Sequence, residues 1–264
     1  MNLIPDRMQQ QRFEHKYLVT PADADRVRDF VKSYLDLDEF SVGKPDYSYE
    51  VHSLYLDTDD LKLYWDTING NKNRFKLRLR YYSVEPEAPV FFEIKSRMNN
   101  IILKQRGGVR QEAAQSLLAG HLPEPHHLIG NHERYLPALE RFCHLMHDLR
   151  ATPRIHIAYL REAYVSPDDQ VRVTMDRNVC AEPNLVYSVK TQMTNPARSF
   201  HGRVILELKF TNRFPDWFRE LVRVFHIMQR GAAKYCESVQ AVGAAAIGAV
   251  GPVAQDEENW AQAR

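Results

Sequence analysis

The chain has 264 residues, of which 44% are hydrophobic and 26% charged, proportions typical of a folded soluble protein rather than of a disordered or collagen-like chain. Lys and Arg number 35 and Asp and Glu 34, so the net charge of +1 gives no overall field toward nucleic acid or an acidic membrane. The three cysteines, Cys143, Cys180 and Cys236, are too few and too scattered for a disulfide scaffold, which favours a reducing, cytoplasmic location.

The two ends of the chain are expected to lie outside the folded domain. Residues 1–10 lack the apolar stretch of a signal peptide, and we predict a short N-terminal tail there. The longest apolar run, residues 241–254, is about 14 residues long and is interrupted by glycine and proline, whereas a membrane-spanning helix needs roughly 20 residues. We therefore expect one domain over residues 11–242, a flexible C-terminal tail over 243–264, and no membrane span.

The first half of the domain alternates between apolar and polar residues, which is typical of strands with one buried face. Strands are predicted over residues 12–19, 47–56, 73–82, 90–97 and 101–106. Thr20, Pro21 and Asp23 indicate the start of a helix that is expected to reach about residue 35. The acidic cluster at residues 57–60 is expected to cap a short helix over 61–65, with Ca²⁺ binding as the weaker alternative.

The second half of the domain mixes helices with further strands. Gly107 and Gly108 are expected to end the fifth strand, and residues 110–149 to be helical or loop-like, with the stronger helix over 134–149. Strands are predicted over residues 154–163, 170–177 and 202–210, with a weaker candidate at 185–190, and helices over 217–229 and from about 232. Because there is no internal repeat and no linker, these elements indicate a single α+β domain.

Positive charge gathers on the strands of the first half. Between Lys72 and Arg110 the sequence has ten basic and three acidic residues, a local net charge of +7, which leaves −6 for the rest of the chain. On the strand over 73–82, lysines and arginines share one face and large apolar residues share the other. Two arrangements fit this alternation: an open antiparallel sheet with one face in water, or a closed barrel with the charged side chains inside.

We favour the closed antiparallel β-barrel, with helices packed on its outside. A solvated face usually mixes both charge signs, whereas the polar side of the 73–82 strand carries Lys and Arg. Neighbouring cations repel more strongly once water is excluded, so an interior of this kind requires a polyanion. The interspersed carboxylates Glu14, Glu93, Asp176 and Glu207 are suited to Mg²⁺ or Mn²⁺, which would bridge to phosphate oxygens.

Eight short motifs follow one another along the chain. They are R-x-E-x-K-Y from Arg12, S-L-Y-L-D from Ser53, K-x-R-x-R-Y from Lys76, F-E-I-K-S-R from Phe92, Y-L-R-E-A-Y from Tyr159, R-V-T-M-D from Arg172, L-E-L-K-F from Leu206 and K-Y from Lys234. In this order they resemble the VTC domain, which is the polyphosphate polymerase domain of the triphosphate tunnel metalloenzyme superfamily. The resemblance covers roughly residues 10–240.

The resemblance implies a β-tunnel in which the γ-phosphoryl group of ATP is transferred to a growing polyphosphate chain, with Mn²⁺ or Mg²⁺ as the cofactor. By position, the residues expected to take part in catalysis are Lys16, Arg78, Arg80, Lys95, Arg161, Arg172, Lys209 and Glu207. Further substrate contacts are expected from Arg12, Lys76, Arg97, Lys104, Arg106 and Lys234. The metal is expected on Glu207, with Glu14 and Glu93 as further ligands or as partners that hold the cations in place.

Two other functions stay open at this point. One is a hydrolase of triphosphate or nucleoside triphosphates, although the hydrolytic relatives carry Glu-x-Glu-x-Lys where this sequence has Arg12 in place of the first carboxylate. The other is a non-catalytic module that binds polyphosphate or nucleotides. The expected partners are ATP and inorganic polyphosphate or triphosphate. Nucleic acid is not expected, because the basic strands lack exposed interleaved aromatics, and a membrane-protein partner outside this chain is left open.

Overall fold

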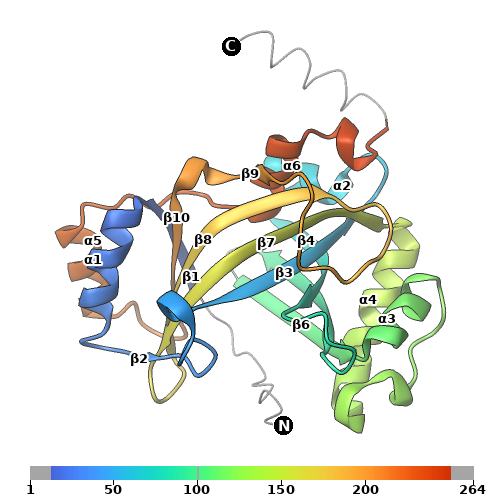
Figure 1. Ribbon diagram of the computed structural model, residues 1–264, viewed down its shortest axis with the longest axis horizontal. Coiled ribbons are helices and arrows are strands. Elements are labelled where there is room, and N and C mark those ends of the chain that lie inside the picture. The colour runs from blue at the N-terminus through green and yellow to red at the C-terminus, as the bar shows by residue number, and fades with distance from the viewer. Residues whose placement is uncertain (1–12, 100, 251–264) are drawn as a thin grey trace.

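The computed structural model describes residues 13–99 and 101–250, and its strands form one curved, ten-stranded antiparallel sheet (Figure 1). From one edge to the other the sheet runs through β1 (Phe13–Val19), β10 (Val204–Phe210), β8 (Val171–Pro183), β7 (Thr152–Val165), β3 (Ser48–Asp57), β4 (Asn73–Tyr81), β5 (Val90–Met98) and β6 (Ile101–Val109). Two short strands extend it, because β2 (Asp36–Leu37) pairs with β7 and β9 (Ala197–Arg198) pairs with β8.

The sheet does not close into a barrel, so the predicted closed β-barrel is wrong. β1 and β6 are the two ends of the sheet, and no strand pairing joins them within the part of the chain that the structure describes. The free edge of β1 is taken by the segment before the last helix, because Tyr17 bridges to Gln229 and the Arg230 N–H donates to the Lys16 carbonyl at 2.9 Å. Alternation predicts which face of a strand is buried, but it does not predict how the two edge strands pair.

Six α-helices among the described residues cover the sheet in three pairs. The pairs are α1 (Pro21–Val31) with α5 (Asp216–Val224), α3 (Gln111–Leu118) with α4 (Leu136–Leu149), and α2 (Lys62–Ile68) with α6 (Lys234–Val242). The first pair packs on β1, β8 and β10, where Val27 and Leu221 are buried, and the second packs on β4, β5 and β6 around Phe142. The third pair packs on β3, β7 and β8 at one end of the sheet, where it lies above the arch of strands (Figure 1).

Two of the predicted helix starts, those of α1 and α2, are confirmed by their caps. The Thr20 side chain accepts a hydrogen bond from the Asp23 N–H at 3.1 Å and so caps α1. At the start of α2 the Asp57 carboxylate accepts hydrogen bonds from the N–H groups of Leu63 and Tyr64, both at 2.9 Å. The first acid of the predicted acidic cluster therefore acts as a helix cap, as expected.

Two helices are shorter than predicted, since α1 ends at Val31 and α5 ends at Val224. After α5 the backbone passes through His226, whose φ is 49°, and the chain then runs to the edge of β1. Short 3-10 helices connect the larger elements: η1 (Pro45–Tyr47), η2 (Pro125–His127), η3 (Ile129–Asn131), η4 (Glu133–Tyr135), η5 (Phe200–Gly202) and η6 (Ala245–Ile247). None of the helices in the described ranges is long and apolar enough to span a membrane.

Two local predictions about strands are wrong. The fifth strand does not end at Gly107, because β6 continues and α4 packs directly on it: a Cβ added at Gly107 would lie 3.0 Å from the Cβ of Leu139. Residues 185–190 form no strand but an irregular segment, which the Tyr81 hydroxyl holds by donating to the Lys190 carbonyl at 2.8 Å. In both places a tertiary contact decides the local structure.

Candidate functional site

One cavity of about 1790 Å³ opens on the polar face of the sheet, and its lining includes fifteen Lys and Arg side chains against seven Asp and Glu. All but two of the predicted site residues line it: Glu14, Lys16, Lys76, Arg78, Arg80, Lys95, Arg97, Lys104, Arg106, Arg161, Arg172, Glu207, Lys209 and Lys234. Glu93 lies behind the lining and contacts several of these cations. Arg12 lies outside the described residues.

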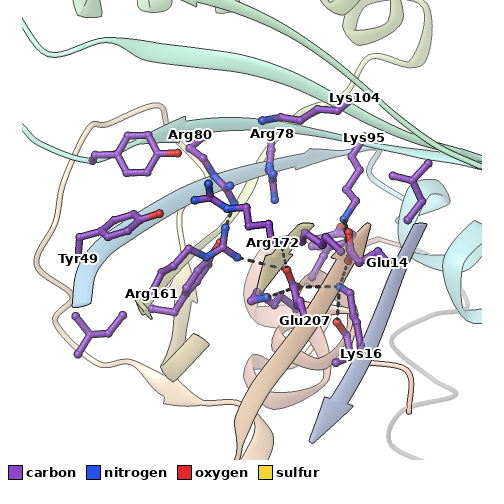
Figure 2. A pocket seen from close by; sticks show the side chains of 18 of the residues that line it. Glu14, Lys16, Tyr49, Arg78, Arg80, Lys95, Lys104, Arg161, Arg172 and Glu207 are labelled. Carbon is purple, nitrogen blue, oxygen red and sulfur yellow. Dashed lines mark hydrogen bonds and ion pairs between the residues drawn. The ribbon is translucent and has the colours of Figure 1, made fainter. Parts of the chain in front are cut away.

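Strand alternation is what brings these side chains together. β4 turns Lys76, Arg78 and Arg80 toward the cavity, and it turns Leu77 and Leu79 toward the apolar cluster under α3 and α4. The other strands of the sheet repeat the pattern, so that cations from both halves of the chain point into the same space (Figure 2). The cationic faces therefore converge as expected, although the sheet around them is open.

Glu93 is the centre of a first cluster of charges. It is fully buried on β5, and its carboxylate contacts Arg78 at 2.6 Å, Lys104 at 2.7 Å and Arg106 at 3.3 Å. Burial by itself would raise the pKa of Glu93, but the cations, Lys104 and Arg78 most of all, lower that pKa well below its usual value. Glu93 therefore stays ionised and holds three cations at the wall of the cavity.

Glu207 is the centre of a second cluster, built from β10, β1, β7 and α6. Its carboxylate contacts Lys209 at 2.7 Å, Lys234 at 3.1 Å, Lys16 at 3.2 Å and Arg161 at 3.6 Å. Burial would raise the pKa of Glu207, but these cations, led by Lys209 and Lys234, lower it well below its usual value. Each cluster thus places several cations around one carboxylate, which is an arrangement that could also surround a phosphate group.

Glu14 connects the edge strand β1 to β5, the strand next to the opposite edge of the open sheet. Its carboxylate contacts Lys16 on the same strand at 3.0 Å and Lys95 of β5 at 3.2 Å (Figure 2). Burial opposes ionisation of Glu14, but the two lysines outweigh it and hold its pKa below the usual value. An ion pair therefore spans the gap that backbone pairing would have closed in a barrel.

Three half-buried lysines of the cavity have a lowered pKa, although Lys104 and Lys209 each contact a carboxylate. Burial lowers the pKa of Lys104 to about 7, and the nearby arginines add to this effect. Burial likewise lowers the pKa of Lys76 to about 8 and that of Lys209 to about 8. A polyanion in the cavity would favour the charged form of all three lysines.

Tyr55 and Tyr159 are site residues that the sequence analysis did not single out. Arg78 donates a hydrogen bond to the Tyr55 hydroxyl at 3.1 Å, and Arg80 donates to the Tyr159 hydroxyl at 2.9 Å. A tyrosine at strand spacing indicates only a core position, so the pattern by itself did not point to them. Tyr55 lies opposite Arg78 in the pairing of β3 with β4. Recognising that these two strands pair would have identified Tyr55 as a site residue.

Two further carboxylates hold the arginines of the site: Asp176, which the sequence analysis considered as a metal ligand, and Asp38, which it did not single out. Asp176 is fully buried and accepts hydrogen bonds from Arg161 at 2.7 and 2.8 Å. Asp38 contacts Arg172 at 2.7 Å, and both side chains line the cavity. Arg97 also lines the cavity but is exposed, so the predicted site includes both buried and exposed cations.

A curved antiparallel sheet with a cationic cavity on its polar face is typical of proteins that bind polyanions. The family model of the VTC domain matches residues 11–243, and the chain belongs to the VTC domain family. The VTC domain is the polyphosphate polymerase domain of the CYTH-like tunnel superfamily. The resemblance noted from the motifs is thereby confirmed.

Comparison with solved structures gives only distant likenesses. The PH1819 protein from Pyrococcus horikoshii OT3 is 12% identical, with a TM-score of 0.45 over 86% of this chain and 96% of that chain. A chain of the Schizosaccharomyces pombe Mediator head module is 8% identical, with a TM-score of 0.42 over 82% of this chain and 94% of that chain. At these TM-scores neither structure supports an argument about function. None of the curated proteins compared with the chain matches it.

Proposed function

We propose that this protein transfers the terminal phosphoryl group of ATP to a polyphosphate chain and releases ADP. Membership of the VTC domain family supports a polyphosphate-related function. The observation on which the proposal rests is the convergence of fifteen Lys and Arg side chains on one cavity that has only seven acidic side chains in its lining. A buried excess of like charge is costly, and a bound polyanion relieves it.

In the proposed reaction a terminal oxygen of the polyphosphate attacks the γ-phosphorus of ATP. The bond from that phosphorus to the oxygen bridging it to the β-phosphorus breaks, and ADP leaves with the electron pair. The acceptor is already an anion, so no general base is needed, and the protein mainly has to position and neutralise the phosphates. Arg78, Arg80 and Arg161 offer planar guanidinium groups that bind phosphate oxygens in pairs, while Lys16 and Lys209 add compact positive charge.

We propose Glu207 and Glu14 as the protein ligands of Mg²⁺ or Mn²⁺. Their strands are neighbours, and both carboxylates contact the same Lys16 ammonium, at 3.2 and 3.0 Å, so they face a common point. Within residues 13–99 and 101–250 no group of three or more His, Cys, Asp or Glu is placed to hold an ion. Two carboxylates fit a metal that takes its other ligands from phosphate and water, and such an ion would neutralise charge on the phosphates.

We assign Glu93 to holding cations rather than to binding metal. Its carboxylate is fully buried and already contacts Arg78, Lys104 and Arg106. Glu93 also does not line the cavity, so a metal ion on it would not reach phosphates bound there, whereas Glu207 and Glu14 both line the cavity. Of the three carboxylates expected to bind metal, Glu207 and Glu14 therefore have the better geometry.

Purified protein incubated with ATP and Mn²⁺ tests the proposed transfer. We expect ADP to form together with polyphosphate chains that lengthen with time on a gel. Free phosphate without chains would contradict the proposal and indicate a hydrolase. Tight triphosphate binding without any turnover would contradict it as well and indicate a binding module, in which Glu207→Gln would leave the affinity nearly intact.

We also propose that the protein acts in the cytoplasm. All three cysteines are free thiols, and Cys143 and Cys236 are buried. A reducing compartment preserves such thiols, and ATP, the proposed donor, has to be available at the same place. A membrane-protein partner stays a prediction, and fractionation of cells that express the tagged protein would show whether any of it sediments with membranes.

A further inference from the structure

One mouth of the cavity is lined by aromatic rings that the proposed reaction does not use. Phe40, Tyr49 and Tyr82 all line the cavity, and we call them the aromatic mouth. The centroid of the Tyr49 ring lies 6.2 Å from that of Phe40 and 6.2 Å from that of Tyr82, so the three rings form a row. Phe40 is 37% and Tyr82 36% exposed, which leaves part of each ring free for a planar ligand.

The aromatic mouth adjoins the arginines that would bind phosphates. Tyr49 lies opposite Arg161 in the pairing of β3 with β7, and Tyr82 follows Arg80 by two residues at the end of β4. Figure 2 shows Tyr49 on the same side of the pocket as Arg161 and Arg80, and on the other side from Lys16. A ligand that stacks at the mouth therefore has its charged end next to the arginines.

The two ends of the cavity differ in charge. The loop that carries Phe40 adds exposed Glu39, Asp46 and Lys44 to the lining, so acidic side chains outnumber basic ones there and disfavour phosphate. At the opposite end of β4, Arg74 pairs with Arg97 on β5, and both side chains line the cavity. This polarity matches a ligand that has one uncharged, planar end and one polyanionic end.

We propose that Phe40, Tyr49 and Tyr82 form a nucleobase subsite, in which the base of a nucleoside triphosphate stacks while its phosphates reach Arg80 and Arg161. The assignment rests on the proposed function, because it concerns the donor of that reaction. Stacking on aromatic rings accepts any base, so the subsite distinguishes a nucleoside triphosphate from inorganic triphosphate rather than one base from another.

The position of the base also sets the direction of the acceptor. In phosphoryl transfer the attacking and leaving oxygens are roughly in line with the transferred phosphorus. With the base at the aromatic mouth, ADP leaves toward that mouth. The polyphosphate chain then lies toward the end of the cavity that carries Arg74 and Arg97.

Binding measurements separate the base from the phosphates. Isothermal titration calorimetry would give the Kd of ATP and of inorganic triphosphate for the wild type, for the double variant Phe40→Ala/Tyr82→Ala and for the control Tyr34→Ala. Tyr34 is also exposed, but its ring stacks on Trp217 at 4.6 Å, between α1 and α5 and outside the cavity. We expect the double variant to raise the Kd of ATP about tenfold or more and to leave the Kd of triphosphate unchanged.

The outcomes are distinct for this subsite and for the proposed transfer. The nucleobase subsite is overturned if the double variant loses affinity equally for ATP and triphosphate, or if its affinity for ATP does not fall. It is also overturned if Tyr34→Ala raises the Kd of ATP as much as the double variant does. If the double variant fails to fold, the single variants Phe40→Ala and Tyr82→Ala are judged by the same two criteria. Selective loss of ATP binding in a protein that makes no chains upholds the subsite and refutes only the transfer.

Discussion

Glu93 shows how much one buried carboxylate does in this site. Because it pairs with Arg78, Lys104 and Arg106, Glu93→Gln leaves three cations in a buried place without their counter-charge. We expect the free energy of unfolding to fall by about 3 to 5 kcal/mol, as for other broken buried ion pairs. Urea unfolding followed by circular dichroism measures this. Glu87→Gln, at an exposed loop position, is the control and should change little; an equal loss in both variants would contradict the role of Glu93.

The low pKa of Lys104 predicts a linkage between binding and protons. Because that pKa is about 7, Lys104 is mostly neutral at pH 8.5 in the free protein, and phosphate binding favours its charged form. Triphosphate binding at about pH 8.5 should therefore take up protons, and affinity should fall as pH rises from about 7 to 9. Calorimetry in two buffers of different ionisation enthalpy measures the uptake. Lys104→Arg, which stays charged, should reduce it, and equal heats in both buffers would refute the prediction.

Single strands were predictable from the sequence, whereas their ends and partners were not. Alternation alone placed Arg78 and Arg80 on the polar face of β4, because one buried face imposes a period of two. It could not show that Tyr159 would hold Arg80, because that contact joins β4 to β7, which lies far along the sequence. The end of β6 was misjudged for the same reason, since the partner that makes a glycine necessary lies on α4.

The contact between β6 and α4 leads to a prediction about how these two elements pack. A Cβ at Gly107 would lie 3.0 Å from the Leu139 Cβ and 3.4 Å from its backbone, so no side-chain rotation relieves the clash. Gly107→Ala should lower the free energy of unfolding by about 1 to 3 kcal/mol, the usual cost of overpacking. Gly231→Ala is the matched control, because a Cβ there meets nothing within 4 Å. Equal denaturation midpoints for the two variants would show that α4 adjusts freely.

For the whole molecule, convergence of charge was predictable and closure of the sheet was not. The motifs and cationic faces pointed to one polyanion site, and the structure gathers them around one cavity. Whether the edges join depends on what occupies the edge of β1. Gln229 and Arg230 do so here, and nothing in their composition marks them as an edge segment.

Stabilisation by a polyanion tests the cavity as a unit. A ligand that binds only the folded protein stabilises it by about 2.7 kcal/mol at a concentration of 100 Kd, so triphosphate should raise the melting temperature of the wild type. Arg78→Ala/Arg80→Ala removes two guanidinium groups from the centre of the cavity and should abolish the rise. Arg213→Ala/Arg219→Ala removes the same charge from side chains that are 75% and 66% exposed and should preserve it. An equal loss of the temperature rise in both double variants would contradict the role of the cavity. So would a loss in Arg78→Ala/Arg80→Ala that occurs only at raised salt concentration. Either result would mean that triphosphate responds to the overall charge of the protein rather than to this cavity.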